Sequence, residues 1–111
     1  MAIKKSLHAV MPENVTTAKG TSIRWLLGPR DDMPNFYMRV LEVAPKGEIS
    51  LHSHPWEHEV FVLEGNGALT GENGELPLTK EELVYVPADE KHGFRNTGNE
   101  AFRFICVIPK S

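Results

Sequence analysis

Three histidines stand within seven residues of one another in the stretch His52-Ser53-His54-Pro55-Trp56-Glu57-His58, and a fourth, His92, follows downstream. In an extended strand, residues i and i+2 point to the same face, so His52 and His54 can aim both imidazoles at one point. Pro55 cannot donate to a sheet ladder, so the strand should end there and His58 should open the next strand. Neutral imidazole is the commonest metal ligand in proteins. The spacing therefore predicts a mononuclear metal site at His52, His54, His58 and His92.

A competing interpretation treats these histidines as solvated side chains on a polar strand. That interpretation would be preferred for a lone His-x-His pair, but two further histidines in this context favour metal binding. The fifth histidine, His8, has no obvious partner in the sequence. Four neutral imidazoles leave a divalent ion with its full charge, which favours anionic partners such as enolates, peroxide, superoxide or carboxylates. A closed tetrahedral zinc site would have the same sequence pattern and would be structural.

The two histidine motifs resemble those of the cupins. The first motif comprises Gly47, His52, His54, His58 and Gly65, and it is similar to the first cupin motif in its glycines and in its His-x-His pair. His58 stands where the family usually has a glutamate ligand. The second is similar to Pro-x-Gly-x2-His-x3-Asn and comprises Pro87, His92 and Asn96, whereas Glu81 and Asp89 stand where glycines are usual. Together the motifs span residues 47–96. The four-histidine set is similar to that of the small, single-domain, manganese-binding cupins.

This resemblance implies an all-β fold, a cupin-type double-stranded β-helix or jelly-roll barrel in a single domain. It also implies one divalent transition metal per chain, with manganese favoured and iron, zinc, nickel or copper as alternatives. Four ligands on a metal that prefers six leave two positions for substrate, oxygen or water.

The elements that must position the histidines are short strands. Apolar or alternating runs bounded by Gly, Pro and Asn predict strands, and no run predicts a helix. The predicted strands are 21–27, 35–43, 49–54, 58–64, 68–70, 76–78, 83–86, 92–95 and 101–108, with 44–47 as a turn. Residues 1–20 form a predicted N-terminal arm, with a short strand at 3–5 as one option, and residues 21–111 form the barrel.

Alternation along 58–64 sets which side chains face the metal. His58 and the two valines after it share one face, while Glu59, Phe61 and Leu63 share the other. Valines suit a barrel interior, so His58 should face inward and Glu59 outward. Phe61 and Leu63 then need another cover. A second copy of the chain is the simplest source, so we expect a homodimer, although a folded-back N-terminal arm would also serve.

The last strand has apolar residues at its even positions, which should place them inside the barrel with the metal. Cys106 is more readily explained as a small core side chain than as a thiol facing the metal. Arg39 is either a solvated residue or a cation of the pocket. The candidate substrate-pocket residues are Trp56, Phe94, Phe104, Cys106, Ile108 and Arg39.

The whole chain limits the classes of function. Its 111 residues suit one domain, and its net charge of −3 argues against a nucleic-acid partner. The single cysteine excludes an intramolecular disulfide framework. No run has the roughly 18 apolar residues of a membrane span, and none resembles a signal-peptide core. We therefore expect no membrane partner and a cytoplasmic location.

The expected function is a metal-dependent oxidoreductase of the dioxygenase or peroxide-using type, acting on a small enolisable or unsaturated molecule. The substrate class rests on the cupin resemblance and on the apolar lining. No side chain stands out as a general base, so no catalytic residue is assigned beyond the metal ligands. A non-catalytic module that binds metal or a small ligand is the leading alternative. A sugar isomerase or epimerase, as some cupins are, is disfavoured because no cluster of Lys, Arg and acids is evident for a sugar phosphate.

Overall fold

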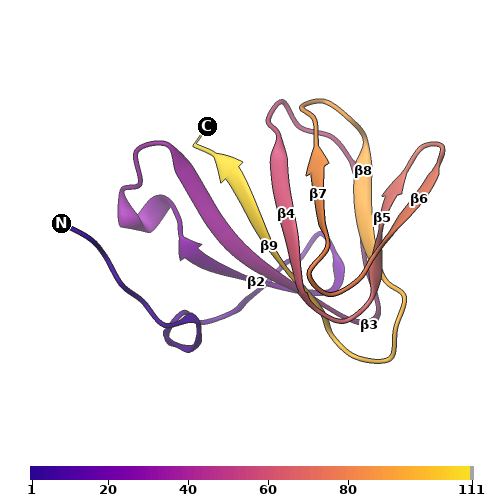
Figure 1. Ribbon diagram of the computed structural model, residues 1–111, viewed down its shortest axis with the longest axis horizontal. Coiled ribbons are helices and arrows are strands. Elements are labelled where there is room, and N and C mark those ends of the chain that lie inside the picture. The colour runs from indigo at the N-terminus through magenta and orange to yellow at the C-terminus, as the bar shows by residue number, and fades with distance from the viewer. Residues whose placement is uncertain (111) are drawn as a thin grey trace.

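β-Strands account for most of the chain in the computed structural model, which describes residues 1–110 (Figure 1). Within those residues the helices are two short 3₁₀ turns, η1 (Leu7–Ala9) and η2 (Pro29–Asp31). The strands are β1 (Glu13–Asn14), β2 (Lys19–Leu27), β3 (Phe36–His52), β4 (His58–Glu64), β5 (Gly67–Gly71), β6 (Gly74–Leu78), β7 (Leu83–Val86), β8 (His92–Asn96) and β9 (Phe102–Pro109). The predicted all-β class is confirmed.

The 17-residue strand β3 connects the two halves of the molecule. Its first half pairs with β9, from Phe36 opposite Pro109 onward, and its second half pairs with β8, where His52 lies opposite His92. The predicted turn at 44–47 is wrong, because the chain bends there without leaving the strand. Lys46 adopts a φ of 67°, and a Cβ at Gly47 would lie 2.8 Å from the carbonyl oxygen of Lys19 on β2. This bend carries β3 from its pairing with β9 to its pairing with β8.

The strand order is β6-β5-β8-β3-β9-β4-β7, with β2 also paired to β3 and β1 paired to β2. All of these pairings are antiparallel, and the sheet curls into a nearly closed single-domain barrel of the predicted jelly-roll type (Figure 1). Buried Asn96 at the end of β8 links this strand to β3 and to the residues before β9. Its side-chain amide donates to the carbonyls of Val43, 2.9 Å away, and Glu100, 2.7 Å away.

The barrel interior is filled by alternate residues of the strands, as the sequence pattern predicts. Along β4, His58 and the two valines are buried, whereas Glu59 and Phe61 are exposed, so the predicted register is confirmed. Along β9, the even positions are buried and the odd positions only partly so. Phe102 and Phe104 are among the most deeply buried side chains. The hydrophobic core therefore fills the barrel interior and borders the histidines.

The N-terminal arm differs from its predicted form. Residues 3–5 form no strand, and the arm instead contributes η1 and the short β1. Lys5 holds the arm through its side chain, because its Nζ lies 2.6 Å from the Asp31 carboxylate and 3.0 Å from the Leu26 carbonyl oxygen. The boundary between arm and barrel stays a prediction. Among residues 1–110, the structure has no helix of the length and apolarity that a membrane crossing requires.

Candidate metal centre

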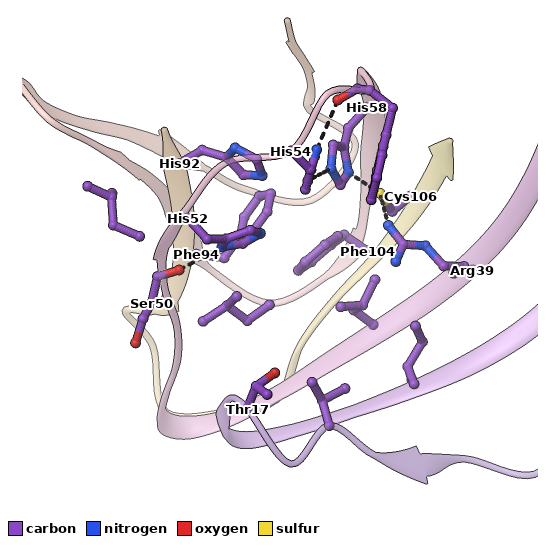
Figure 2. Close-up of a pocket in the computed structure, with 16 residues that line it drawn as sticks. Thr17, Arg39, Ser50, His52, His54, His58, His92, Phe94, Phe104 and Cys106 are labelled. Atoms are coloured by element: carbon purple, nitrogen blue, oxygen red, sulfur yellow. Dashed lines mark hydrogen bonds between the residues drawn. The ribbon is translucent and has the colours of Figure 1, made fainter. Parts of the chain in front are cut away.

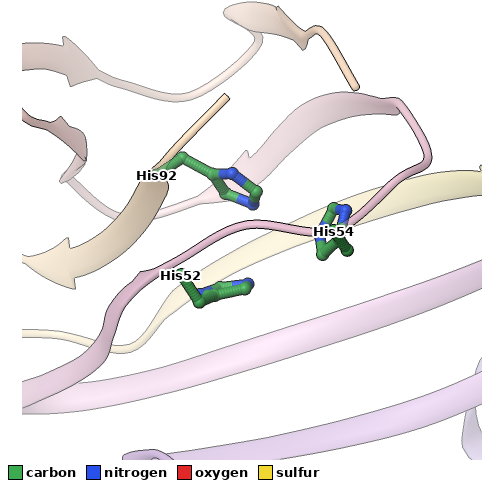
Figure 3. Close-up of side chains that lie close together, drawn as sticks. All are labelled: His52, His54 and His92. Carbon is green, nitrogen blue, oxygen red and sulfur yellow. The ribbon is translucent and has the colours of Figure 1, made fainter. Parts of the chain in front are cut away.

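Three imidazoles meet at one end of the barrel (Figure 3). His52 ends β3 and His92 begins β8, and the antiparallel register places them directly opposite each other. His54 lies in the irregular connection after β3, because the strand ends at His52 instead of running to residue 54 as predicted. One ring nitrogen from each of the three lies within 4.8 Å of the others. His52 is exposed and His92 is buried, so the cluster is open to solvent on the side of His52.

The hydrogen bonds of these three rings fix which nitrogen is free. The Nδ1 atoms of His52, His54 and His92 lie 2.7, 2.9 and 2.8 Å from the carbonyl oxygens of Ser50, Trp56 and Glu90, respectively. A carbonyl oxygen only accepts, so each Nδ1 carries the hydrogen and each Nε2 carries a lone pair. Backbone carbonyls commonly orient metal-binding histidines in this way. The three rings are thus set as Nε2 donors to a cation.

His58 lies beside this group but outside it. Its Nε2 contacts the Nε2 of His54, and its Nδ1 lies 2.8 Å from the sulfur of Cys106 on β9 (Figure 2). Since the His54 Nε2 is an acceptor, His58 must donate through its own Nε2 and accept at Nδ1 from the Cys106 thiol. Arg39 Nη2 donates to the same sulfur at 2.9 Å. The structure therefore shows a cluster of three histidines, with the fourth linked to it by one hydrogen bond, to His54.

Burial keeps these imidazoles neutral. Desolvation lowers the pKa of His54, His58 and His92, and for His58 it acts with the nearby Arg39 cation to lower the pKa to about 3. Burial also raises the pKa of the Cys106 thiol, in keeping with its role as a donor to His58. A neutral imidazole is the form that binds a metal, so burial holds these three rings in the form that can bind one.

The residues present fit a divalent transition metal. The Nε2 of His92 is buried and has no hydrogen-bond partner among residues 1–110. A buried nitrogen lone pair without a partner is costly, and a cation beside His52 and His54 would satisfy it. An all-imidazole donor set suits zinc, copper, iron and nickel, so these donors do not select one metal.

A cavity of about 290 Å³ opens onto the histidine cluster and is mostly apolar (Figure 2). Five of the predicted pocket residues line it: Arg39, Trp56, Phe94, Phe104 and Cys106. Ile108 does not; it is buried in the core toward the end of β9, opposite Tyr37. Trp56 stacks flat on the ring of His54, with centroids 4.5 Å apart. Sequence reasoning missed Val15 and Thr17, because the N-terminal arm has no apolar period to indicate that it borders the cavity.

Comparisons with known proteins agree with this geometry. Residues 39–108 match the family model Cupin_2, described as a cupin domain. An uncharacterized protein of Methanocaldococcus jannaschii, MJ1618, is 31% identical over 97 residues, covering 81% of this chain and 74% of that protein. Polyketide synthase CurC of Streptomyces cyaneus is 32% identical over 89 residues, which cover 78% of this chain but only 58% of CurC.

Among solved structures, the chain is similar to the polyketide cyclase RemF from Streptomyces resistomycificus. The TM-score is 0.91 at 32% sequence identity, and the match covers 98% of this chain and 80% of RemF.

Proposed function

This chain belongs to the cupin family, and from that membership we propose that it is a metal-dependent enzyme acting on a small enolisable carbonyl compound. The observation that carries the proposal is the convergence of three oriented Nε2 donors on an apolar cavity. The names of RemF, a polyketide cyclase, and CurC, a polyketide synthase, support it. Polyketide chains carry repeated carbonyl groups, and the protons between two such groups are readily removed.

We propose His58 as the fourth ligand, together with His52, His54 and His92. Its support is that the Nε2 atoms of His54 and His58 already face each other, so both are directed at the same region. As a ligand, His58 would carry its proton on Nδ1 instead of Nε2 and would donate it to the Cys106 sulfur. Manganese is the favoured metal on the sequence resemblance, with iron, zinc, nickel and copper as alternatives. A divalent metal held there would act as a Lewis acid on a carbonyl oxygen or, if redox-active, would support reaction with oxygen or peroxide.

The chain's own residues supply the surroundings for that chemistry. Phe94 and Phe104 stack with ring centroids 4.6 Å apart and form an apolar wall that excludes water. The cavity volume of about 290 Å³ is at the small end for ligand pockets and suits a small molecule. Arg39 adds the one cationic side chain among the lining residues. These features favour a compact substrate that carries negative charge as it reacts.

An oxidoreductase of the dioxygenase or peroxide-using type is the second candidate. The observation that favours it is that no Asp, Glu or Lys is among the residues that line the cavity. Redox-neutral enolisation requires a group to accept the substrate proton, whereas oxygen or peroxide chemistry at a metal depends less on such a base. The two candidates share the same site and differ in whether an oxidant is consumed.

The test uses metal-loaded protein and a panel of β-diketones, β-keto esters and β-keto acids. Hydrogen–deuterium exchange next to the carbonyl is followed by NMR without oxygen, and oxygen or peroxide consumption is measured separately. Exchange faster than with the same metal in buffer supports redox-neutral chemistry, and oxidant consumption supports the oxidoreductase. Either activity should be lost in His92→Ala and kept in His8→Ala, whose histidine lies outside the cluster. Tight metal binding with neither activity would contradict both and favour a non-catalytic module.

A further inference from the structure

Arg39 is a cation in the cavity wall with no anionic partner. Its Nη2 donates to the sulfur of Cys106 at 2.9 Å, and its Cζ lies 5.4 Å from the centre of the Trp25 ring. No carboxylate of residues 1–110 lies within ion-pair distance of it. Its Nε is buried and has no hydrogen-bond partner in the described part of the chain. The guanidinium therefore retains both unsatisfied charge and an unsatisfied donor.

The surroundings of Arg39 make this arrangement costly unless an anion binds. No Asp or Glu is among the residues that line the cavity, so none of them neutralises the guanidinium. A divalent metal at the histidine cluster would add more positive charge to the same low-dielectric space. Charges of one sign in such a space repel each other strongly, and a bound anion would remove that repulsion. A guanidinium with free donors is well suited to a carboxylate.

We propose that Arg39 binds the carboxylate of the substrate and so restricts it to short oxo acids, whose carbonyl oxygen faces the histidines. This inference rests on the proposed function and names the substrate class within it. Only the Cys106 sulfur separates Arg39 from His58, at 2.9 Å on one side and 2.8 Å on the other (Figure 2). A molecule with a carboxylate and a carbonyl two or three bonds apart is therefore short enough to reach both groups. The small cavity volume favours the same class.

The experiment compares acetoacetate with its methyl ester, because the two share the carbonyl group but only the acid has a carboxylate. Binding to zinc-loaded protein is measured by calorimetry, so no turnover is needed. The wild-type protein should bind acetoacetate at least tenfold more tightly than methyl acetoacetate. Arg39→Gln should weaken acetoacetate binding at least tenfold and leave the affinity for the ester almost unchanged. Arg39→Lys should lose less of the affinity for acetoacetate, because it keeps the positive charge.

Arg95→Gln is the matched control, because Arg95 is an exposed arginine paired with Glu75 and does not line the cavity. It should keep the full preference for the acid. Equal affinity of wild-type protein for acid and ester would overturn the inference without any variant, even if Arg39→Gln fails to fold. An unchanged preference for acetoacetate over its ester in folded Arg39→Gln would also overturn the inference. The role of Arg39 would then be to pack on Trp25. Turnover of the neutral ester at full rate would leave the proposed function standing while this inference falls.

Discussion

The Nδ1 of His58 lies 2.8 Å from the sulfur of Cys106, whereas the Nδ1 atoms of the other three clustered histidines lie against backbone carbonyls. A backbone partner survives any substitution, but a side-chain partner does not. The orientation of His58 is therefore the one that depends on the identity of another residue.

Replacing Cys106 should weaken metal binding without removing any proposed ligand. Loss of the partner that orients a metal-binding histidine typically costs 10- to 100-fold in metal affinity. We expect Cys106→Ala to lower zinc affinity by about tenfold on that basis, and Cys106→Ser to lower it less because a hydroxyl can still contact His58. Competition with a chelator of known affinity measures both. Unchanged affinity in Cys106→Ala would mean that the sulfur does not position His58.

The metal-free protein should lose stability as the pH falls below about 6.5. Burial lowers the pKa of His54, His58 and His92 in the folded state, to about 3 for His58, whereas unfolded histidines titrate near 6.5. Between these values the unfolded chain binds more protons than the folded chain. The contribution of these histidines to the free energy of unfolding is therefore complete above pH 6.5 and is lost as the pH falls toward 3.

Each histidine held fully neutral contributes a slope of about 1.4 kcal/mol per pH unit. Urea denaturation at pH 7, 6 and 5 measures the slope above the range in which Asp31 and Glu75, whose pKa values are also lowered, take up protons. A flat profile between pH 6.5 and 5 would contradict the buried, neutral state of these rings.

The sequence predicted β4 and β7 with the bounds that the structure has, because each is a short apolar run between clear breaking residues. It also predicted the inward faces of β4 and β9, since side-chain alternation depends only on local geometry. It failed at residues 44–47, where Ala-Pro-Lys-Gly is typical of a turn. There, pairing between Lys19 and Glu48 holds the bent chain in the sheet, and that long-range contact leaves no local signal.

For the site, spacing predicted four histidine ligands, and the structure brings His52, His54 and His92 together; His58 as a ligand stays a prediction. Spacing did not predict that His54 would lie beyond the end of the strand, or that His58 would stand apart from the other three. The contact between His58 and Cys106 depends on the register of β4 against β9, in which Val60 lies opposite Cys106. Two strands 40 residues apart can pair in several registers, so only the structure reveals this partner.

We expect the chain to form a homodimer through the outer face of β4, β7 and β9. Phe61, Leu83 and Tyr85 are 40%, 71% and 52% exposed and border a shallow apolar groove, so the N-terminal arm does not cover this face. Soluble monomers seldom expose such a patch. Size-exclusion chromatography with light scattering at micromolar concentration should give a dimer, and Phe61→Glu should give a monomer. A monomeric wild-type protein would contradict the prediction.

Gly93 should not tolerate a side chain, because β8 passes close to β3 there. A Cβ at Gly93 would lie 2.4 Å from the carbonyl oxygen of Ile49, a backbone atom that cannot move aside without shifting the strand. We expect Gly93→Ala to lower the free energy of unfolding by about 1–3 kcal/mol, the usual cost of overpacking. Gly71→Ala is the control, since its nearest neighbour would lie at 3.5 Å. Equal free energies of unfolding for the two variants would contradict the close approach.

We propose that one divalent metal is held by the Nε2 atoms of His52, His54, His58 and His92. Long-range ¹⁵N NMR of the histidine rings during titration with zinc tests it directly, because zinc is diamagnetic and each ring nitrogen is seen separately. One equivalent of zinc should shift all four Nε2 resonances, leave the Nδ1 of His52, His54 and His92 protonated, move the His58 proton from Nε2 to Nδ1, and leave His8 unchanged. If only the Nε2 resonances of His52, His54 and His92 shift, His58 is not a ligand. If no resonance shifts to saturation at one equivalent of zinc, the metal centre itself is contradicted.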